Sequence, residues 1–266
     1  MSIYQSSKFN DGKLHVVFCD VGQGDGIYIR TPNGSDVVID GGPDNSILLC
    51  LTNSMPFWDR TIDLMILTHP DSDHYTGLIS VARQYEVMSF ATSFTERSVA
   101  GYETLSNILS EKGAQERFVC QGDKFGLGKE VTMKIMWPRS CALGSTEKND
   151  NSVVSILEYK DLQILLTGDA EVNIGDFYQD LAGDVDILKV PHHGSRDGVD
   201  GEYLDTIKPE VSILSVGGEN RYGHPTADTL ELLKNYGSKI MRTDKHGEIE
   251  ITSDGKIYNI QSEIPN

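Results

Sequence analysis

The stretch His69-Pro70-Asp71-Ser72-Asp73-His74 contains two imidazoles and two carboxylates, four side chains of the kinds that bind metal ions. It follows the short apolar run 62–68, which is typical of a buried strand. A strand end is rigid, and the loop after it can converge with other loops. Side chains of this kind are costly to leave unpaired at such close range, and a divalent cation resolves the repulsion. The alternative is a polar surface turn that happens to be rich in aspartate.

Two later segments also place ligand-type residues after a predicted strand. The run 162–167 leads into Gly168-Asp169, and the run 186–190 leads into Pro191-His192-His193-Gly194. A lone aspartate after glycine is more often a turn residue, whereas adjacent histidines at a strand end are uncommon as structure. Together the three segments supply ligands for two divalent metal ions, with Asp169 as the natural bridge. Such a pair of ions lowers the pKa of a shared water and stabilises an oxyanion on the substrate.

Strand-like and helix-like patterns alternate along the rest of the chain. The patterns predict strands at 14–19, 26–30, 36–40, 131–137, 153–159 and 211–216. They predict helices at 46–54, 75–83, 102–112 and 227–236, a loop at 141–150 and a hairpin-like C-terminal end. Strand-rich halves that each add helices indicate two sheets packed face to face, with helices outside, in one domain.

The composition describes an ordinary globular chain with a large acidic excess. Among 266 residues there are 23 Lys and Arg against 40 Asp and Glu, a formal net charge of −17. This charge favours solubility and argues against broad, non-specific attraction to nucleic acid. A nucleic-acid substrate is still compatible with it, because metal ions neutralise some carboxylates and a local basic patch can exist on an acidic protein.

The cysteines and the N-terminus bear on the cellular compartment. No apolar run is long enough to span a bilayer, and residues 1–10 are polar without an apolar signal region. The default compartment is therefore the cytoplasm. The four cysteines (Cys19, Cys50, Cys120, Cys141) are scattered without a Cys-x-x-Cys pair, so we expect reduced and mostly buried thiols.

The ordered series of motifs resembles the metallo-β-lactamase superfamily, and more narrowly the C-terminal hydrolase domain of ComEC-type DNA-uptake (competence) proteins. The superfamily motifs are Thr68 to Gly77, Thr167 to Asp169 and His192 to Ser195. Four further segments match the narrower branch: Asp20-Val21-Gly22-Gln23-Gly24-Asp25, Ile39-Asp40-Gly41-Gly42, Asn149-Asp150-Asn151-Ser152 and Tyr222-Gly223-His224-Pro225. Thr243-Asp244-Lys245-His246-Gly247 resembles the closing hairpin of the family. The resemblance implies an α/β fold, the four-layer αββα sandwich. It also implies one hydrolase domain over residues 1–266, with a core at about 14–253.

Carried over by position, the resemblance implies a dinuclear site. His69 and Asp71 would hold the first ion, Asp73 and His74 would hold the second, and Asp169 would bridge them. One or both of His192 and His193 would complete the site, and the sequence does not decide which.

The sequence departs from the wider superfamily at two positions. Asp71 stands where most members have a second histidine, and Asn151 falls where most have a further histidine ligand. Both changes replace nitrogen by oxygen, so manganese is a candidate beside zinc. They also argue against β-lactam hydrolysis as the main function.

The remaining matched residues have alternative interpretations. Asp25 and Asp40 orient the histidine ligands or are turn residues. His224 donates to a substrate oxygen or protonates a leaving group, or it is a plain loop histidine. We expect Asp73 and His224 to be the catalytic side chains. His15, in a predicted strand, and His246 look structural.

Several further residues are candidates for binding a phosphodiester. Ser195 and Asn151 could form hydrogen bonds with a phosphate. Lys189, Arg196 and Arg221 lie beside the histidine loops in sequence, where they could supply a basic rim. Lys189 has the competing interpretation of an ordinary strand-end lysine.

These observations predict a metal-dependent phosphodiesterase or nuclease that acts on DNA with a water activated by two metal ions. A hydrolase of small phosphodiesters or other esters is the alternative, favoured by the net charge. A metal-binding module that lost catalysis is a third, opposed by the intact ligand set. ComEC-type proteins join this domain to a membrane channel, so the chain is either an excised domain, outside the cytoplasm and with a channel partner, or a stand-alone relative.

Overall fold

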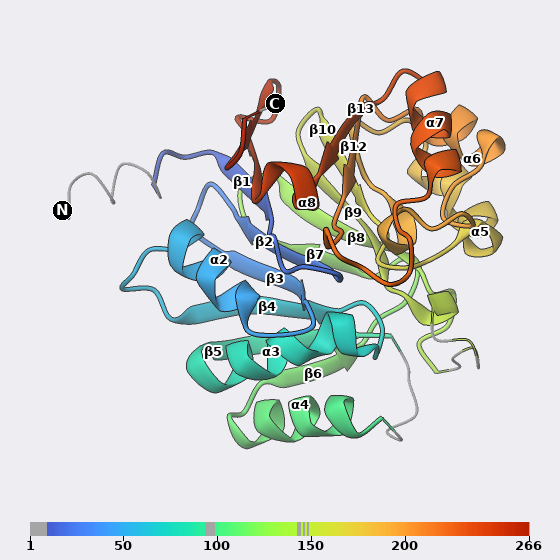
Figure 1. Ribbon diagram of the computed structural model, residues 1–266. Helices are drawn as coiled ribbons and strands as arrows, with labels where there is room; N and C mark the ends of the chain where they lie inside the picture. The colour runs from blue at the N-terminus through green and yellow to red at the C-terminus, as the bar shows by residue number, and fades with distance from the viewer. Residues whose placement is uncertain (1–9, 94–98, 143–144, 146, 148, 266) are drawn as a thin grey trace.

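Two β-sheets pack face to face in the computed structural model, and helices cover the outer face of each sheet (Figure 1). The structure describes residues 10–93, 99–142, 145, 147 and 149–265. The predicted domain limits of 1–266 and the predicted loop 141–150 therefore include residues that lie outside the described ones. The four-layer αββα prediction is confirmed.

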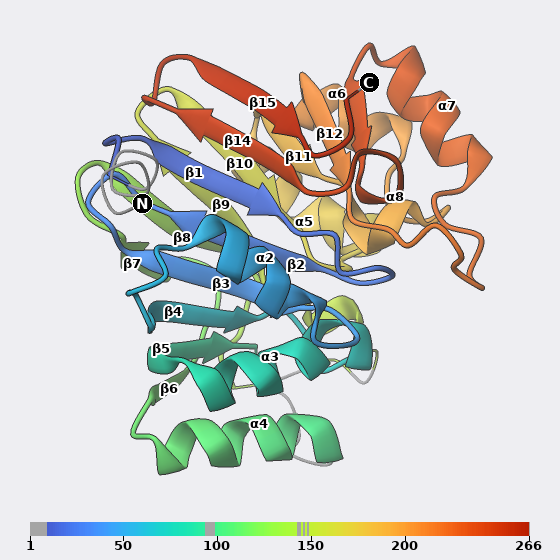
Figure 2. The same cartoon turned by 60° about the vertical axis from the view of Figure 1, so that its left-hand side comes forward.

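The first sheet has eight strands in the order β15-β14-β1-β2-β3-β4-β5-β6, seen side by side in Figure 2. The strands are β1 (Leu14–Phe18), β2 (Gly26–Arg30), β3 (Asp36–Gly41), β4 (Thr61–Leu67), β5 (Glu86–Thr92), β6 (Gln115–Phe118), β14 (Ile249–Ser253) and β15 (Tyr258–Ser262). Pairing is antiparallel from β15 to β3 and parallel from β3 to β6.

The second sheet has seven strands in the order β13-β12-β11-β10-β9-β8-β7. They are β7 (Lys124–Gly126), β8 (Val131–Trp137), β9 (Val154–Tyr159), β10 (Leu162–Leu166), β11 (Ile187–Lys189), β12 (Val211–Leu214) and β13 (Lys239–Arg242). Pairing is antiparallel from β7 to β10 and parallel from β10 to β13. Each sheet thus has one antiparallel and one parallel part.

The helices lie on the two outer faces and in the loops (Figure 1). They are α2 (Ser46–Ser54), α3 (Ser72–Gln84) and α4 (Ala100–Glu111) on the first sheet, and α5 (Val172–Ala182), α6 (Gly201–Ile207) and α7 (Ala227–Asn235) on the second. The short elements are α8 (Thr243–His246) and the 3-10 turns η1 (Asn149–Asn151) and η2 (Pro191–Gly194). Within the described part of the chain, each helix lacks the length and apolarity that crossing a bilayer demands.

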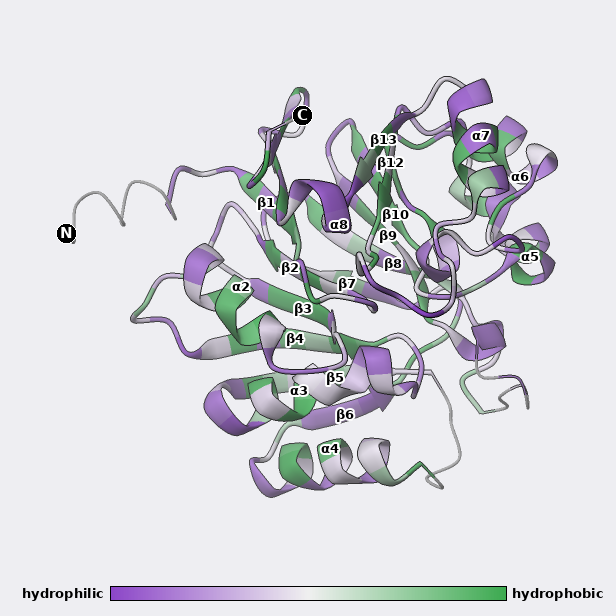
Figure 3. Ribbon diagram, in the orientation of Figure 1, coloured by the Kyte–Doolittle hydropathy of each residue, from purple (hydrophilic) through white to green (hydrophobic). Residues whose placement is uncertain are grey.

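The side chains of the central strands fill three apolar layers. In β3, Val37 and Ile39 belong to the core between the sheets, while Val38 belongs to the core under the helices. This alternation is the period of a strand that is buried on both faces. Figure 3 shows the result as hydrophobic strands between helices whose colour alternates along their length.

The decisive motif is the beginning of a helix rather than a free turn. We predicted a helix from residue 75, but α3 begins at Ser72, with Asp71 as its extended N-cap. A Cβ atom on Gly77 would overlap the carbonyl oxygen of Gly41, so glycine is needed for α3 to lie this close to the end of β3. The motif therefore projects from a helix that is packed directly on the first sheet.

The prediction of four reduced thiols is wrong, because the cysteines form two disulfides. Cys19 joins Cys50, with Cα atoms 5.8 Å apart, and Cys120 joins Cys141, with Cα atoms 4.9 Å apart. Both separations lie in the range that a disulfide spans. The partners are 31 and 21 residues apart in sequence, so only the folded chain brings them together.

Three small predictions about the ends of the chain can also be compared with the structure. β14 and β15 form the expected C-terminal hairpin. The segment 243–247 is the helical turn α8 rather than a hairpin, because the amide of Gly247 donates to the carbonyl of Thr243. His15 has the expected structural task, since its ring contacts the carboxylates of Asp11 and Glu250.

Candidate metal centre

The predicted ligands come from three strand ends, which meet at one edge of the sandwich. β4 ends before His69, β10 ends before Asp169, and β11 ends before the His192-His193 pair. Each of these strands belongs to the parallel part of its sheet. The carboxyl ends of parallel strands are where ligands bind in α/β sheets. The site therefore lies where the carboxyl ends of β4, β10 and β11 come together.

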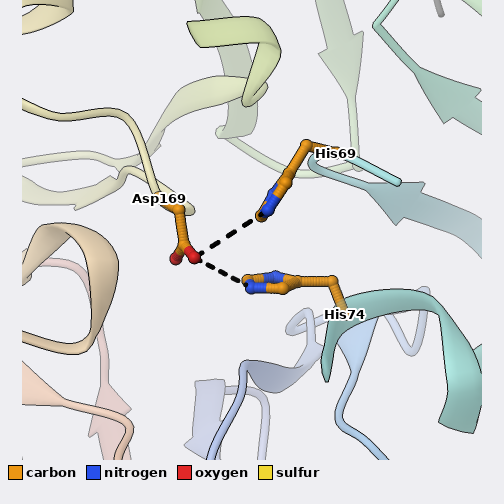
Figure 4. Close-up of side chains that lie close together, drawn as sticks. All are labelled: His69, His74 and Asp169. Carbon is orange, nitrogen blue, oxygen red and sulfur yellow. Dashed lines mark hydrogen bonds and ion pairs between the residues drawn. The ribbon is translucent and has the colours of Figure 1, made fainter. Parts of the chain in front are cut away.

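Asp169 is at the centre of the cluster. Its Oδ2 atom lies 3.2 Å from Nε2 of His74, 3.4 Å from Nε2 of His193 and 3.8 Å from Nε2 of His69. Figure 4 shows His69 and His74 approaching this carboxylate from β4 and α3. Nε2 of His192 is slightly farther away, at 3.9 Å. One carboxylate oxygen that faces four imidazoles has the geometry expected of a bridging ligand.

The motif aspartates lie on two sides of Asp169. Oδ2 of Asp71 is 3.8 Å from Nε2 of His69, and Oδ2 of Asp73 is 3.6 Å from Nε2 of His193. Donor atoms from His69, His74 and Asp169 lie within 4.8 Å of one another, and so do donor atoms from Asp73, His74 and His193. The cluster therefore offers two neighbouring positions for a cation.

Asp40 orients two of the histidines. His74 donates from Nδ1 to Oδ2 of Asp40 at 2.7 Å, and the hydroxyl of Thr68 donates to the same oxygen at 2.7 Å. The Thr68 oxygen in turn accepts from Nδ1 of His69 at 3.1 Å. Asp40 adopts a left-handed backbone with φ 55°, which is strained for a residue other than glycine. Both histidines consequently present Nε2 to Asp169.

Asp25 and Lys189 support the opposite side of the cluster. Nδ1 of His193 donates to the carbonyl of Ser215 at 2.9 Å and lies 3.4 Å from Oδ1 of Asp25. Oδ2 of Asp25 is 2.5 Å from the ammonium of Lys189. That ammonium also donates to the carbonyl of Gly168 at 2.9 Å. Lys189 is fully buried, so the prediction that it forms part of a basic rim is wrong.

The two adjacent histidines have different surroundings. His193 is buried, whereas the His192 side chain is 26% exposed and donates from Nδ1 to Oε1 of Glu171 at 2.6 Å. Both residues have positive φ, and both rings bring Nε2 to within 4 Å of Oδ2 of Asp169. Sequence reasoning missed Glu171, because it belongs to none of the motifs. Its position two residues after Asp169 is the signal that could have found it.

Burial and neighbouring charges shift the pKa values of the cluster in directions that favour cation binding. Burial and the neighbouring His74 lower the pKa of His69 to about 3, so this ring is neutral and its Nε2 lone pair is available. Burial opposes ionisation of Asp169, but the imidazolium charges of His193 and His74 hold its pKa well below its ordinary value. A divalent ion would take the place of these protons, since a histidine binds metal through a deprotonated nitrogen.

The donor atoms fit a pair of divalent ions. Nε2 of His69, Nε2 of His193 and Oδ1 of Asp169 are buried and have no hydrogen-bond partner among the described residues. Buried polar atoms in that state need another partner, such as an ion. The cluster and its support carry five carboxylates (Asp25, Asp40, Asp71, Asp73, Asp169) and the Lys189 ammonium. Two divalent ions with neutral imidazoles would balance these charges.

The cluster opens into a small cavity of about 120 Å³. Its lining includes Asp71, Asp73, Asp169, His192 and His193, together with Gln23, Asn149, Tyr222 and His224. We call the buried set His69, His74, Asp169 and His193 the floor. We call the set Arg221, Tyr222 and His224, from the loop between β12 and α7, the rim.

The predicted substrate-binding residues lie at different distances from this cavity. His224 lines it, and its ring centroid is 5.4 Å from that of His192. Arg221 belongs to the same loop and is exposed, whereas Arg196 is 79% exposed and lies 3.9 Å from Asp228. The structure therefore places Arg221, and not Arg196, next to a residue that lines the cavity.

Ser195 and Asn151 are both buried. Oγ of Ser195 has no hydrogen-bond partner among the described residues. Oδ1 of Asn151 accepts from the amide of Ser145, and its Nδ2 donates to the carbonyls of Ser145 and Glu147. The Asn151 side chain thus shapes its own loop. Its contact with a phosphate stays a prediction.

A model of the metallo-beta-lactamase superfamily matches residues 19–218, more than half of the chain. The chain belongs to this superfamily, whose fold implies divalent metal ions.

Among characterised proteins, the chain is similar to ComEC-type competence proteins. ComE operon protein 3 of Bacillus subtilis (strain 168) is 27% identical over 262 residues, which cover 91% of this chain and 33% of that protein. Recombination protein 2 of Haemophilus influenzae is 25% identical over 236 residues, which cover 87% of this chain and 28% of that protein. The chain thus spans about a third of the length of the curated relatives it matches.

Solved structures resemble the chain in fold alone. CmlA, a diiron beta-hydroxylase from Streptomyces venezuelae, has a TM-score of 0.57 at 15% identity, covering 89% of this chain and 53% of CmlA. Zn(2+)-bound PqqB from Methylobacterium extorquens has a TM-score of 0.55 at 11% identity, covering 86% of this chain and 97% of PqqB.

Proposed function

We propose that this chain is a metal-dependent phosphodiesterase that hydrolyses DNA at the cavity above the floor. The observation that carries the proposal is the convergence of three histidine Nε2 atoms on one oxygen of Asp169. Asp71 and Asp73 flank this centre, and a cavity opens above it. The similarity to competence proteins supports DNA as the substrate.

Each residue of the floor has a proposed role. His69, Asp71 and Asp169 would hold one divalent ion, and Asp73, His74, His193 and Asp169 would hold the second. Two such ions supply Lewis-acid stabilisation of the phosphate charge and lower the pKa of water. Asp40 and Asp25 keep the histidines in the tautomer that presents Nε2. We propose that His192 is held by its hydrogen bond to the Glu171 carboxylate and is not one of the metal ligands.

His224 and Ser195 are two proposed substrate contacts. His224 lines the cavity, so its ring can donate to a phosphate oxygen or to the leaving group. The buried hydroxyl of Ser195 has a free donor to offer. Asp73 keeps its proposed catalytic role beside its role as a ligand.

The two ions are proposed to be zinc or manganese. Aspartate at position 71, where most superfamily members have histidine, makes the first position rich in oxygen donors and favours manganese. We expect manganese to support at least as much activity as zinc, and Asp71→His to shift the preference towards zinc. Activity titrations of both proteins with each metal measure this. If both proteins work only with zinc, the argument from ligand hardness is wrong.

The net charge of −17 and the small cavity favour a second candidate, a hydrolase of small phosphodiesters. One panel separates the two candidates. Zinc and manganese forms are assayed on bis-p-nitrophenyl phosphate, single- and double-stranded DNA, RNA and a chromogenic β-lactam. The proposal expects DNA and bis-p-nitrophenyl phosphate to be cleaved. Cleavage of the small diester alone would favour the second candidate.

We further propose that the chain works outside the cytoplasm, beside a membrane channel. Two disulfides favour an oxidising compartment. The competence proteins that it resembles are about three times longer than the matched region. Labelling of free thiols in protein taken directly from its native cells tests the compartment. Four reactive thiols would point to the cytoplasm.

A further inference from the structure

The cavity is open to solvent, and its lining joins the ligand-type residues Asp71, Asp73, Asp169 and His193 to the exposed Tyr222 and the half-buried His224. In any nucleotide substrate whose reacting phosphate lies over Asp169, the groups attached to that phosphate would extend towards Tyr222 and His224. The residues of the rim are the first ones that these groups would meet.

An exposed tyrosine stands at that position. The Tyr222 side chain lines the cavity and is 55% exposed. Its ring is nearly parallel to that of His224, with an angle of 12° and a centroid distance of 6.1 Å. The next ring inwards is that of His192, 5.4 Å from His224. A series of rings therefore leads from the floor outwards, and Tyr222 is its outermost member.

The loop that carries Tyr222 is held closed by one side chain. Asn220 donates from Nδ2 to the carbonyls of Gly217 at 2.8 Å and His224 at 2.6 Å. Its Oδ1 accepts from the amide of His224 at 3.0 Å. Gly223 adopts φ +74°, which a residue with a side chain rarely does. The ring position is thus preorganised, although the ring itself is exposed.

Arg221 adds a positive charge beside this ring. Its guanidinium carbon is 5.2 Å from the Tyr222 ring centroid, and its Nη2 donates to the Tyr222 hydroxyl at 3.2 Å. A phosphate next to a stacked base could meet this guanidinium. Long-range attraction contributes little for a chain with a net charge of −17, so short-range stacking has to supply affinity for a nucleic acid.

We propose that Tyr222 stacks on the nucleobase adjacent to the reacting phosphate and thereby selects diesters that carry an unpaired base. This inference rests on the proposed phosphodiesterase function. A base within a duplex is already stacked on both neighbours, so its face is not available to Tyr222. Tyr222 is a specificity residue: it acts on the nucleoside and leaves the chemistry at the floor unchanged.

The test compares two substrates with the same leaving group, p-nitrophenyl thymidine 5′-phosphate and p-nitrophenyl methyl phosphate. We expect Tyr222→Leu to lower kcat/KM about tenfold on the thymidine ester, in line with the loss of one stacking contact, and to leave the methyl ester unchanged. Tyr222→Phe keeps the ring and should behave as the parent protein. Tyr236→Leu, which removes an exposed tyrosine away from the cavity, is the matched control.

Equal losses on both esters in Tyr222→Leu, or no loss on either, would overturn the stacking role while leaving the phosphodiesterase in place. If neither ester is hydrolysed by the parent protein, the proposed function fails, and binding then decides the stacking role. Calorimetric titration with thymidine 5′-phosphate and with methyl phosphate provides that measurement. Weaker binding of the nucleotide alone in Tyr222→Leu supports stacking, and unchanged binding contradicts it.

Discussion

The floor and the rim of the cavity differ in how their residues are held. In the floor, His74 contacts two carboxylates, and Asp169 faces three buried imidazoles besides the partly exposed His192. In the rim, Tyr222 and Arg221 contact mainly each other and their own loop. The floor is therefore a connected network, whereas the rim is a set of separate contacts.

Because of this difference, we expect metal binding and substrate preference to respond to different substitutions. Removing one member of a buried polar network leaves its partners without compensation, so the effects are large and do not depend on the substrate. Removing an exposed side chain costs only its own contact with a ligand. We therefore expect substitutions in the floor to abolish metal binding and activity. Substitutions in the rim should change which substrate is preferred.

The largest effect is expected for Asp169→Asn. This change removes the charge that faces four histidines, so we expect at least a thousandfold loss of activity on bis-p-nitrophenyl phosphate, as found when a central catalytic group is lost. Elemental analysis should find close to two ions per parent chain and fewer in the variant. Asp228→Asn, at an exposed position, is the control. A variant that keeps both ions and most of its activity would show that Asp169 does not bridge.

A second experiment tests whether the support of the floor behaves as a network. Lys189→Met removes the ammonium partner of the buried Asp25 carboxylate, which should lower the free energy of unfolding by about 3–5 kcal/mol. The double variant Asp25→Asn/Lys189→Met removes both charges and should lose less. Urea denaturation of the metal-free proteins measures the difference. If the single variant is at least as stable as the double one, the ion pair does not stabilise the floor.

The two disulfides differ in burial, as the floor and the rim do. Cys19–Cys50 is buried in the core beside α2, whereas Cys120–Cys141 is partly exposed. We expect a mild reductant to open Cys120–Cys141 first, because it must reach the sulfur atoms. Loss of either bond should cost roughly 3–4 kcal/mol of stability, from the entropy of a longer free loop.

Thiol alkylation and mass spectrometry at successive times of reduction give the order of opening. Urea denaturation of Cys120→Ser/Cys141→Ser and of Cys19→Ser/Cys50→Ser gives the two free energies. Opening of the buried bond first would contradict the burial argument.

The smallest effects are expected for the arginines. Arg221→Ala should lower DNA cleavage several-fold and make its salt dependence shallower, because one phosphate contact is lost. Arg196→Ala should have less effect, since Arg196 lies beside the Asp228 carboxylate, whereas Arg221 contacts Tyr222, which lines the cavity. Neither variant should change hydrolysis of bis-p-nitrophenyl phosphate. Equal losses on both substrates would favour the small-diester function.

The local sequence pattern was sufficient to predict much of the secondary structure. The alternation of apolar residues predicted most of the central strands, since burial on two faces leaves a period that is visible in sequence. The spacing from His69 to His74 predicted a ligand cluster, because these side chains lie on one strand end and one helix start. Strands β5, β6, β7 and β13 were missed, since their mixed composition carries no such period.

The sequence alone therefore determined the superfamily resemblance, the candidate ligands and the division into two strand-rich halves that each add helices. The tertiary structure decided the separation of His192 from His193, the pairing of Lys189 with Asp25, the place of Glu171 and the disulfides. Each of these depends on which residue of a distant segment lies within a few ångströms. Sequence spacing records the neighbours of a residue along the chain, and it does not record the neighbours that packing of the two sheets brings to it.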